Sequence, residues 1–115
     1  FYSNARDFAR IGKLYLQKGR WETQQLVDSN WVNQSILSNG LNDENGNKTD
    51  YYGYQWWVLK NANYPAFYCR GILGQYIVVV PSKNTIIVRL GKKRGAKIVD
   101  NQPLEVIQYI NELAQ

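Results

Sequence analysis

The segment that most restricts the fold is AFYCRGILGQYIVVVP at positions 66–81, where Gly71 and Gly74 interrupt a run of aromatic and β-branched residues. Residues of these types favour strands. No Asn-Gly or Asp-Gly dipeptide marks a hairpin turn, and the apolar pattern continues through both glycines, so we expect one strand over 66–80. Glycine inside a strand often marks a bulge or a close approach of a ligand to the backbone. The pattern therefore indicates chemistry at the backbone near these glycines.

The segments around this strand predict an α+β unit. Asn4 can cap a helix over 5–18, a second helix is expected over 30–37, and a polar surface loop follows over 38–50. Further strands are expected over 52–59 and 85–90, and Pro103 can open a final helix. We predict one domain, residues 1–115, with a three-stranded antiparallel sheet and the N-terminal and C-terminal helices packed on one face of it.

Composition excludes several classes of function. The chain has 115 residues, a net charge of +5, no His and a single Cys. A zinc site or a Cys-His catalytic site therefore cannot be built from it, and we expect no metal and no cofactor. Its basic cluster, Lys92, Lys93, Arg94 and Lys97, is interpreted as a solvated loop, so no nucleic-acid partner is expected. No apolar run approaches the roughly 18 residues that a membrane span needs.

Four stretches carry a resemblance to a known family: ARDFARIGKLYLQKGRW at 5–21, LVDSNWVNQS at 26–35, YYGYQWWV at 51–58 and FYCRGILGQYIVVVPSKNTIIVRLG at 67–91. In this order they resemble serine hydrolases related to class C β-lactamases and penicillin-binding proteins, closest to the branch of esterases and 6-aminohexanoate-dimer hydrolases. Those enzymes are far longer, so the resemblance implies a C-terminal portion. The chain begins at Phe1 and contains no Met, and we expect residues upstream of Phe1 in the translated protein.

The resemblance also implies partners and a place. The partners would be the remainder of the parent hydrolase and a small amide or ester substrate. A bacterial periplasm or cell envelope would be the location.

The resemblance implies a role for the glycine segment. Gly71 takes the place of the glycine in the family's Lys-Thr-Gly or His-x-Gly element, and the Ile72 backbone N–H takes that of an oxyanion-hole donor. Cys69 stands where the Lys or His would be and Arg70 where the Thr would be, and both depart from the β-lactamase pattern. This departure leaves an amidase or an esterase open. Gly74 and Gln75 are expected to contact substrate with Cys69 and Arg70.

The rest of the family's catalytic machinery is missing from this chain. No Ser has a Lys three residues later, and Tyr2-Ser3-Asn4, which matches a Tyr-x-Asn element, is interpreted as a helix cap. The chain alone is therefore expected to be inactive.

The aromatic set at 51–57 has two interpretations. Strand alternation would place at least half of these rings in the core, whereas Tyr54 and Trp57 are candidates for a cleft wall.

Two alternatives to the hydrolase remain open: a binding module that stacks sugars or bases on these rings, and a structural domain without chemistry. We also expect an exposed apolar sheet surface through which the chain could dimerise.

Overall fold

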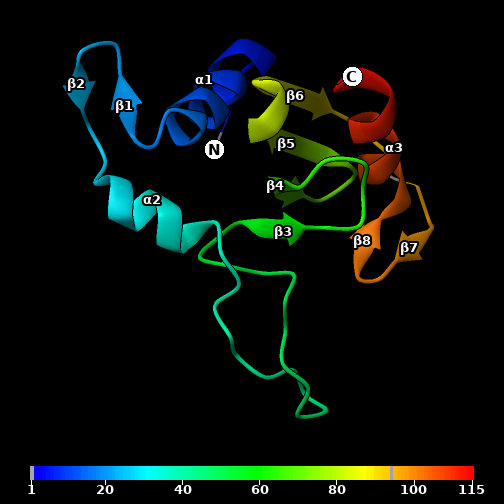
Figure 1. The fold of residues 1–115 in the computed structure, drawn as a ribbon. Helices are drawn as coiled ribbons and strands as arrows, with labels where there is room; N and C mark the ends of the chain where they lie inside the picture. Colours follow the sequence, from blue (N-terminus) through cyan, green and yellow to red (C-terminus); the bar gives the residue numbers. More distant parts are fainter. Residues whose placement is uncertain (1, 94) are drawn as a thin grey trace.

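The computed structural model describes residues 2–93 and 95–115. Three α-helices and several antiparallel strands make up this part of the chain, which confirms the α+β class (Figure 1). The elements are α1 (Ala5–Leu16), β1 (Arg20–Trp21), β2 (Gln24–Gln25), α2 (Ser29–Ser35), β3 (Trp57–Leu59), β4 (Ala66–Gly71), β5 (Gln75–Val80), the 3₁₀ turn η1 (Pro81–Lys83), β6 (Thr85–Leu90), β7 (Ile98–Val99), β8 (Gln102–Pro103) and α3 (Leu104–Leu113). Within this part no helix is both long and apolar enough to cross a bilayer.

The central sheet has four strands in the order β3-β4-β5-β6, so the predicted three-stranded sheet was wrong. The expected single strand over 66–80 is two strands, which pair from Phe67–Val79 to Gly71–Gln75. The chain reverses between them because Leu73 and Gly74 take left-handed backbone conformations, with φ of 63° and 78°. A residue in this region cannot continue a strand, so the second glycine acts in a turn.

The expected strand over 52–59 is also shorter and begins only at Trp57. Before it the chain passes close to α2: a Cβ added to Gly53 would lie 2.2 Å from the Ser35 carbonyl oxygen. Gln55 has φ of 66°, which interrupts an extended conformation. Tyr52 and Trp57, both within the expected strand, instead form an isolated antiparallel bridge with each other.

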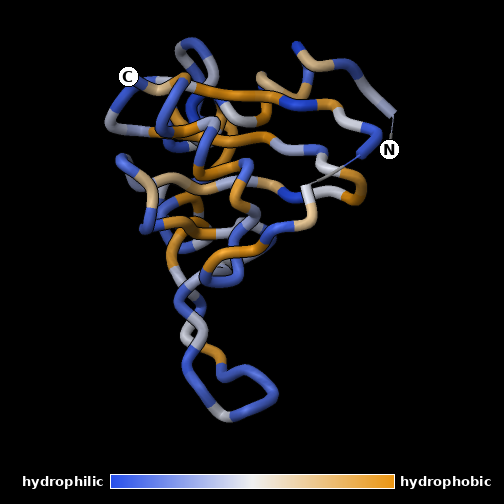
Figure 2. The backbone as a smooth tube through the Cα atoms, turned by 90° about the vertical axis from the view of Figure 1, so that its right-hand side faces the viewer, coloured by the Kyte–Doolittle hydropathy of each residue, from blue (hydrophilic) through white to orange (hydrophobic). Residues whose placement is uncertain are grey.

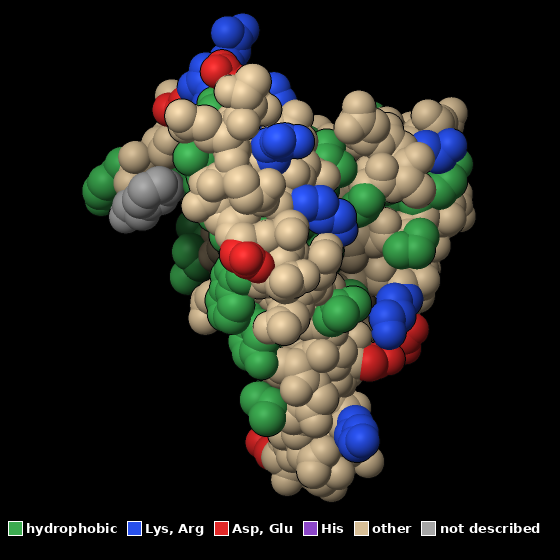
Figure 3. Space-filling model, turned by 60° about the vertical axis from the view of Figure 1, so that its left-hand side comes forward, with side chains coloured by type: hydrophobic (Ala, Val, Ile, Leu, Met, Phe, Trp, Pro, Cys, Tyr) green, Lys and Arg blue, Asp and Glu red, His purple; other side chains and the backbone are tan. Residues whose placement is uncertain are grey.

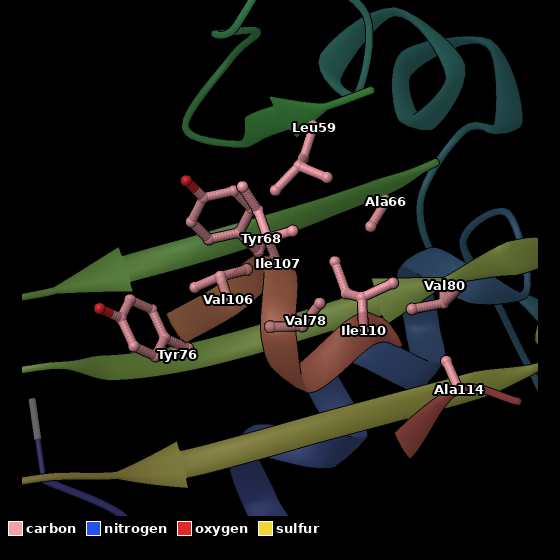
Figure 4. Packing of buried hydrophobic residues seen from close by; sticks show 10 residues of the cluster. All are labelled: Leu59, Ala66, Tyr68, Tyr76, Val78, Val80, Val106, Ile107, Ile110 and Ala114. Carbon is pink, nitrogen blue, oxygen red and sulfur yellow. The ribbon is translucent and has the colours of Figure 1, made fainter. Parts of the chain in front are cut away.

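The terminal helices cover opposite faces of the sheet, whereas one shared face was predicted. On one face α3 packs against alternate residues of β4 and β5 (Figure 4); this cluster includes Tyr68, Tyr76, Val78, Val80, Val106, Ile107 and Ile110. On the other face Gly12 of α1 lies against Ile77, Val79 and Ile86. The cause is the continuous apolar sequence of β5, since a strand that is apolar on both sides needs cover on both sides.

The polar segment over 38–50 forms a long hydrophilic extension from the body of the molecule (Figure 2), held by a bridge between Asn42 and Lys48. The short hairpins β1–β2 and β7–β8 were not predicted. The predicted helix cap at Asn4 is confirmed, because the Asn4 side chain accepts a hydrogen bond from the Asp7 N–H at 3.0 Å. Lys92, Lys93 and Lys97 of the basic loop are exposed, and Arg94 lies outside the described residues.

Candidate functional site

Strand β4 has a free edge at its C-terminal end. β3 pairs only with Ala66, Phe67 and Tyr68, so within the described part of the chain no strand lies beside Cys69–Gly71 on that side. The Val58 N–H donates to the Tyr51 carbonyl at 2.8 Å, away from β4. The β3–β4 hydrogen bonds therefore belong to the Trp57–Tyr68 and Leu59–Ala66 pairs.

Alternation along β4 then fixes which backbone groups face this edge. Since Ala66 and Tyr68 bond toward β3, Arg70 directs its N–H and C=O toward the same side, where no strand follows. Ile72 is the next residue of the series and begins the turn to β5. A free strand edge of this kind can bind an extended chain through backbone hydrogen bonds.

The turn Ile72-Leu73-Gly74 carries a backbone donor, the Ile72 N–H, at the surface. Ile72 is 79% exposed, and no hydrogen bond joins its N–H to another residue of 2–93 or 95–115. Gly71 is exposed, whereas Gly74 is buried beneath the end of β6. The geometry therefore leaves the Ile72 N–H available to an incoming acceptor.

A hollow of about 200 Å³ lies beside this turn, and its wall is mostly apolar. Four of the predicted site residues line it: Cys69, Arg70, Gly71 and Gln75. The structure adds four that sequence reasoning missed, namely Phe8 of α1, Tyr76, Ile77 and Leu90. Phe8 was expected only as part of an apolar helix stripe, and nothing in the sequence indicated which strand that stripe would meet.

The thiol of Cys69 does not replace the cation that the family places there. Burial raises its pKa to about 11, so it is a neutral group at neutral pH. Positive charge at the free edge comes instead from Arg70, whose guanidinium carbon lies 5.0 Å from the centroid of the Trp57 ring. This cation–π contact joins two predicted site residues from neighbouring strands.

The phenol of Tyr76 has a raised pKa because it is buried, donates a hydrogen bond to Glu105 and lies near that carboxylate, with Arg70 and Arg89 opposing the shift. It is therefore protonated at neutral pH and serves as a donor.

Tyr54, like Trp57, is not among the residues that line the hollow. Its ring stacks on Trp31 of α2, with centroids 5.4 Å apart and planes inclined by 8°. One face of Tyr54 is therefore occupied by another ring, and its contact with substrate stays a prediction. Trp56 is buried with Phe67 in the core, as the packing interpretation of this aromatic set expects.

On the face shown in Figure 3, Lys and Arg side chains are scattered among neutral and acidic ones and do not form one patch. The hollow lies on the α1 side of the sheet with Phe8, Cys69 and Ile77, and no hydroxyl of Ser or Thr is among its lining residues. The Tyr76 phenol is directed to Glu105 on the α3 side, and the Arg70 guanidinium lies over Trp57. The neighbouring Ile72 N–H can bind and polarise a carbonyl group, but the lining of the hollow holds no activated hydroxyl nucleophile.

Comparison with known proteins identifies the fold. No family model matches the chain, and no curated protein matches its sequence. A solved structure described as "Putative 6-aminohexanoate-dimer hydrolase from Bacillus anthracis" superposes with a TM-score of 0.64 at 22% identity, over 98% of this chain and 30% of that one. The chain thus has the fold of part of that structure and spans less than a third of its length.

Proposed function

We propose that this chain is the C-terminal part of a β-lactamase-related serine hydrolase that cleaves an amide or an ester through an acyl-enzyme. The observation that carries the proposal is the Ile72 N–H, which has no hydrogen-bond partner among residues 2–93 and 95–115, at the end of a free strand edge beside a hollow. The similar structure from Bacillus anthracis is described as a 6-aminohexanoate-dimer hydrolase, which supports a hydrolytic reaction.

In this proposal the rest of the protein supplies a serine nucleophile and its base. The serine oxygen attacks the carbonyl carbon, and the negative charge that develops on the carbonyl oxygen is stabilised by the Ile72 N–H. The amine or alcohol leaves with a proton, and water then releases the acid. Gly71 leaves room for the acyl group to approach the strand.

The walls of the hollow would hold the substrate. Cys69, as a neutral thiol, and Ile77 offer an apolar wall, Gln75 offers hydrogen-bond donors at its rim, and the Arg70 side chain would contact substrate at the neighbouring free edge. Trp57 would act through the Arg70 side chain that lies over its ring.

Replacing Ile72 in the full-length protein tests the proposal. Proline has no N–H, so Ile72→Pro removes the donor, and it breaks no backbone hydrogen bond within the described chain because this N–H has no partner there. Loss of one oxyanion donor costs about 2.7–4 kcal/mol, so we expect kcat on p-nitrophenyl esters or anilides to fall about a hundredfold or more. Ile72→Val keeps the donor and should be mild.

Circular dichroism and an unchanged KM would establish that Ile72→Pro is folded and binds substrate. A folded Ile72→Pro protein with undiminished kcat would show that the oxyanion assignment is wrong. The isolated chain should not turn over these substrates. A burst of chromophore from it, abolished by a serine-directed acylating agent, would reveal a nucleophile within residues 1–115.

A further inference from the structure

Arg89 of β6 connects the β4–β5 turn to the loop that follows β6. One guanidinium nitrogen donates to the Gly74 carbonyl oxygen, and the other donates to the Lys93 carbonyl oxygen at 2.8 Å. Arg89 pairs with Tyr76 across β5 and β6, which lie side by side (Figure 1), and its side chain is half-buried. No carboxylate within the described residues forms an ion pair with it; the ion pair there joins Arg10 and Asp7. The Arg89 guanidinium therefore donates its hydrogen bonds to two backbone carbonyl oxygens.

Gly91 leaves the space that the guanidinium occupies. A Cβ at this position would lie 2.1 Å from an Arg89 terminal nitrogen and 2.8 Å from the Gly74 carbonyl oxygen. Any side chain at Gly91 would therefore push the guanidinium or the turn out of place. Arg89 and Gly91 therefore both serve the Gly74 carbonyl group: Arg89 donates a hydrogen bond to it, and Gly91 leaves the space for that contact.

The residue held by this contact belongs to a turn that needs support. Leu73 precedes Gly74 with φ of 63°, a conformation that a bulky side chain disfavours and that persists only when its surroundings enforce it. Gly74 is buried while Ile72 and Leu73 are exposed. The contact from Arg89 therefore fixes the turn at its inner end.

We propose that Arg89 is a positioning residue that holds the Ile72 N–H in place for hydrolysis, acting through the Gly74 carbonyl. This inference rests on the proposed function, since it assigns Arg89 a role in the same oxyanion site. A planar guanidinium can donate to two carbonyls at once, whereas a lysine ammonium acts as a single flexible charge. The two hydrogen bonds from Arg89, together called the clamp, would keep the Ile72 N–H within the narrow range of positions that catalysis requires.

The test uses the full-length protein and four variants: Arg89→Gln, Arg89→Ala and Gly91→Ala, with Arg6→Gln as a control for the loss of an exposed arginine on α1. Hydrogen–deuterium exchange, read by mass spectrometry on peptides covering 70–77, measures the order of the turn. Steady-state kinetics measures kcat and KM. We expect faster exchange in this peptide for the three clamp variants, a kcat about 10- to 100-fold lower, and an unchanged KM. Added guanidinium should restore part of the kcat of Arg89→Ala.

Each outcome is decisive. Unchanged exchange in Arg89→Gln and Gly91→Ala would overturn the clamp, whatever the activity. Faster exchange with full kcat would show that the clamped turn does not carry the catalytic donor. A wild-type protein inactive on every ester and amide would overturn the proposed function alone, and the exchange data would still decide whether Arg89 orders the turn. If Gly91→Ala fails to fold, Arg89→Ala with and without guanidinium gives the same comparison.

Discussion

Leu73 holds a left-handed conformation that costs a branched side chain about 1–2 kcal/mol. Asparagine tolerates this region better. We therefore expect Leu73→Asn to raise the free energy of unfolding, measured by urea titration, by about 1 kcal/mol. Asn84, which already lies in this region with φ of 48°, offers the reciprocal control. Asn84→Leu should lower the free energy of unfolding by a similar amount. A destabilised Leu73→Asn protein would mean that contacts of the leucine outweigh its backbone strain.

The half-buried thiol of Cys69 gives a prediction on pH. Its pKa of about 11 in the folded chain exceeds the ordinary thiol value of about 8.5. Folding therefore favours the protonated form, so the associated stability is present below about pH 8.5 and is lost as the pH rises toward 11. At pH 8 iodoacetamide should alkylate folded Cys69 about tenfold more slowly than the urea-unfolded chain. Equal rates would show that the thiol is not shielded.

Some residues of the site could be predicted from the sequence, because they are neighbours in it. Cys69, Arg70, Gly71 and Gln75 lie together at the hollow because a short hairpin keeps such residues close, and their contact with substrate stays a prediction. Arg89 could not be predicted, because its contact with Gly74 depends on the pairing register of β5 with β6. The role proposed for Arg89 therefore rests on three-dimensional contacts rather than on the sequence.

At the scale of elements, the placement of the helices depended on information that periodicity does not carry. The helix patterns and caps predicted three helices near their observed bounds, with α1 ending at Leu16 rather than residue 18. The run QYIVVV shows that β5 is a strand, but it is apolar at almost every position and so cannot say which face each helix covers. Gly12 marks the side of α1 that meets the sheet, since it is the one buried residue of this helix.

Gly12 permits the close approach of α1 to the sheet. An added Cβ would lie 3.0 Å from Ile86 and 3.1 Å from Ile77. Valine here would gain a few tenths of a kcal/mol in helix propensity but would force α1 away from the sheet, so we expect Gly12→Val to destabilise the protein by about 1–3 kcal/mol. Arg6→Val, on the exposed side of the same helix, should change the unfolding free energy by about 0.5 kcal/mol or less in urea titration. A neutral Gly12→Val would indicate that α1 shifts without cost.

At the scale of the whole molecule, one end of the central sheet carries apolar side chains that are only partly covered. Ile72 and Leu73 at the turn and Leu90 at the end of β6 are exposed large apolar side chains near one end of the hairpin. Exposed apolar surface of this kind often marks an interface. The structure from Bacillus anthracis is more than three times as long as this chain, and the proposed function assigns the cover of this region to further protein.

The free chain should therefore associate through this end. We expect sedimentation velocity between about 5 and 200 µM to show a concentration-dependent shift from monomer to dimer, because two weakly covered apolar ends gain by excluding water from each other. The double variant Ile72→Gln/Leu90→Gln keeps both backbone N–H groups and removes apolar surface, so it should remain monomeric over this range. Leu26→Gln/Leu37→Gln, which removes two exposed leucines from another part of the molecule, is the matched control and should still associate. A wild-type chain that stays monomeric at 200 µM would refute an interface at this end, and association that survives the Ile72→Gln/Leu90→Gln change would place the interface elsewhere.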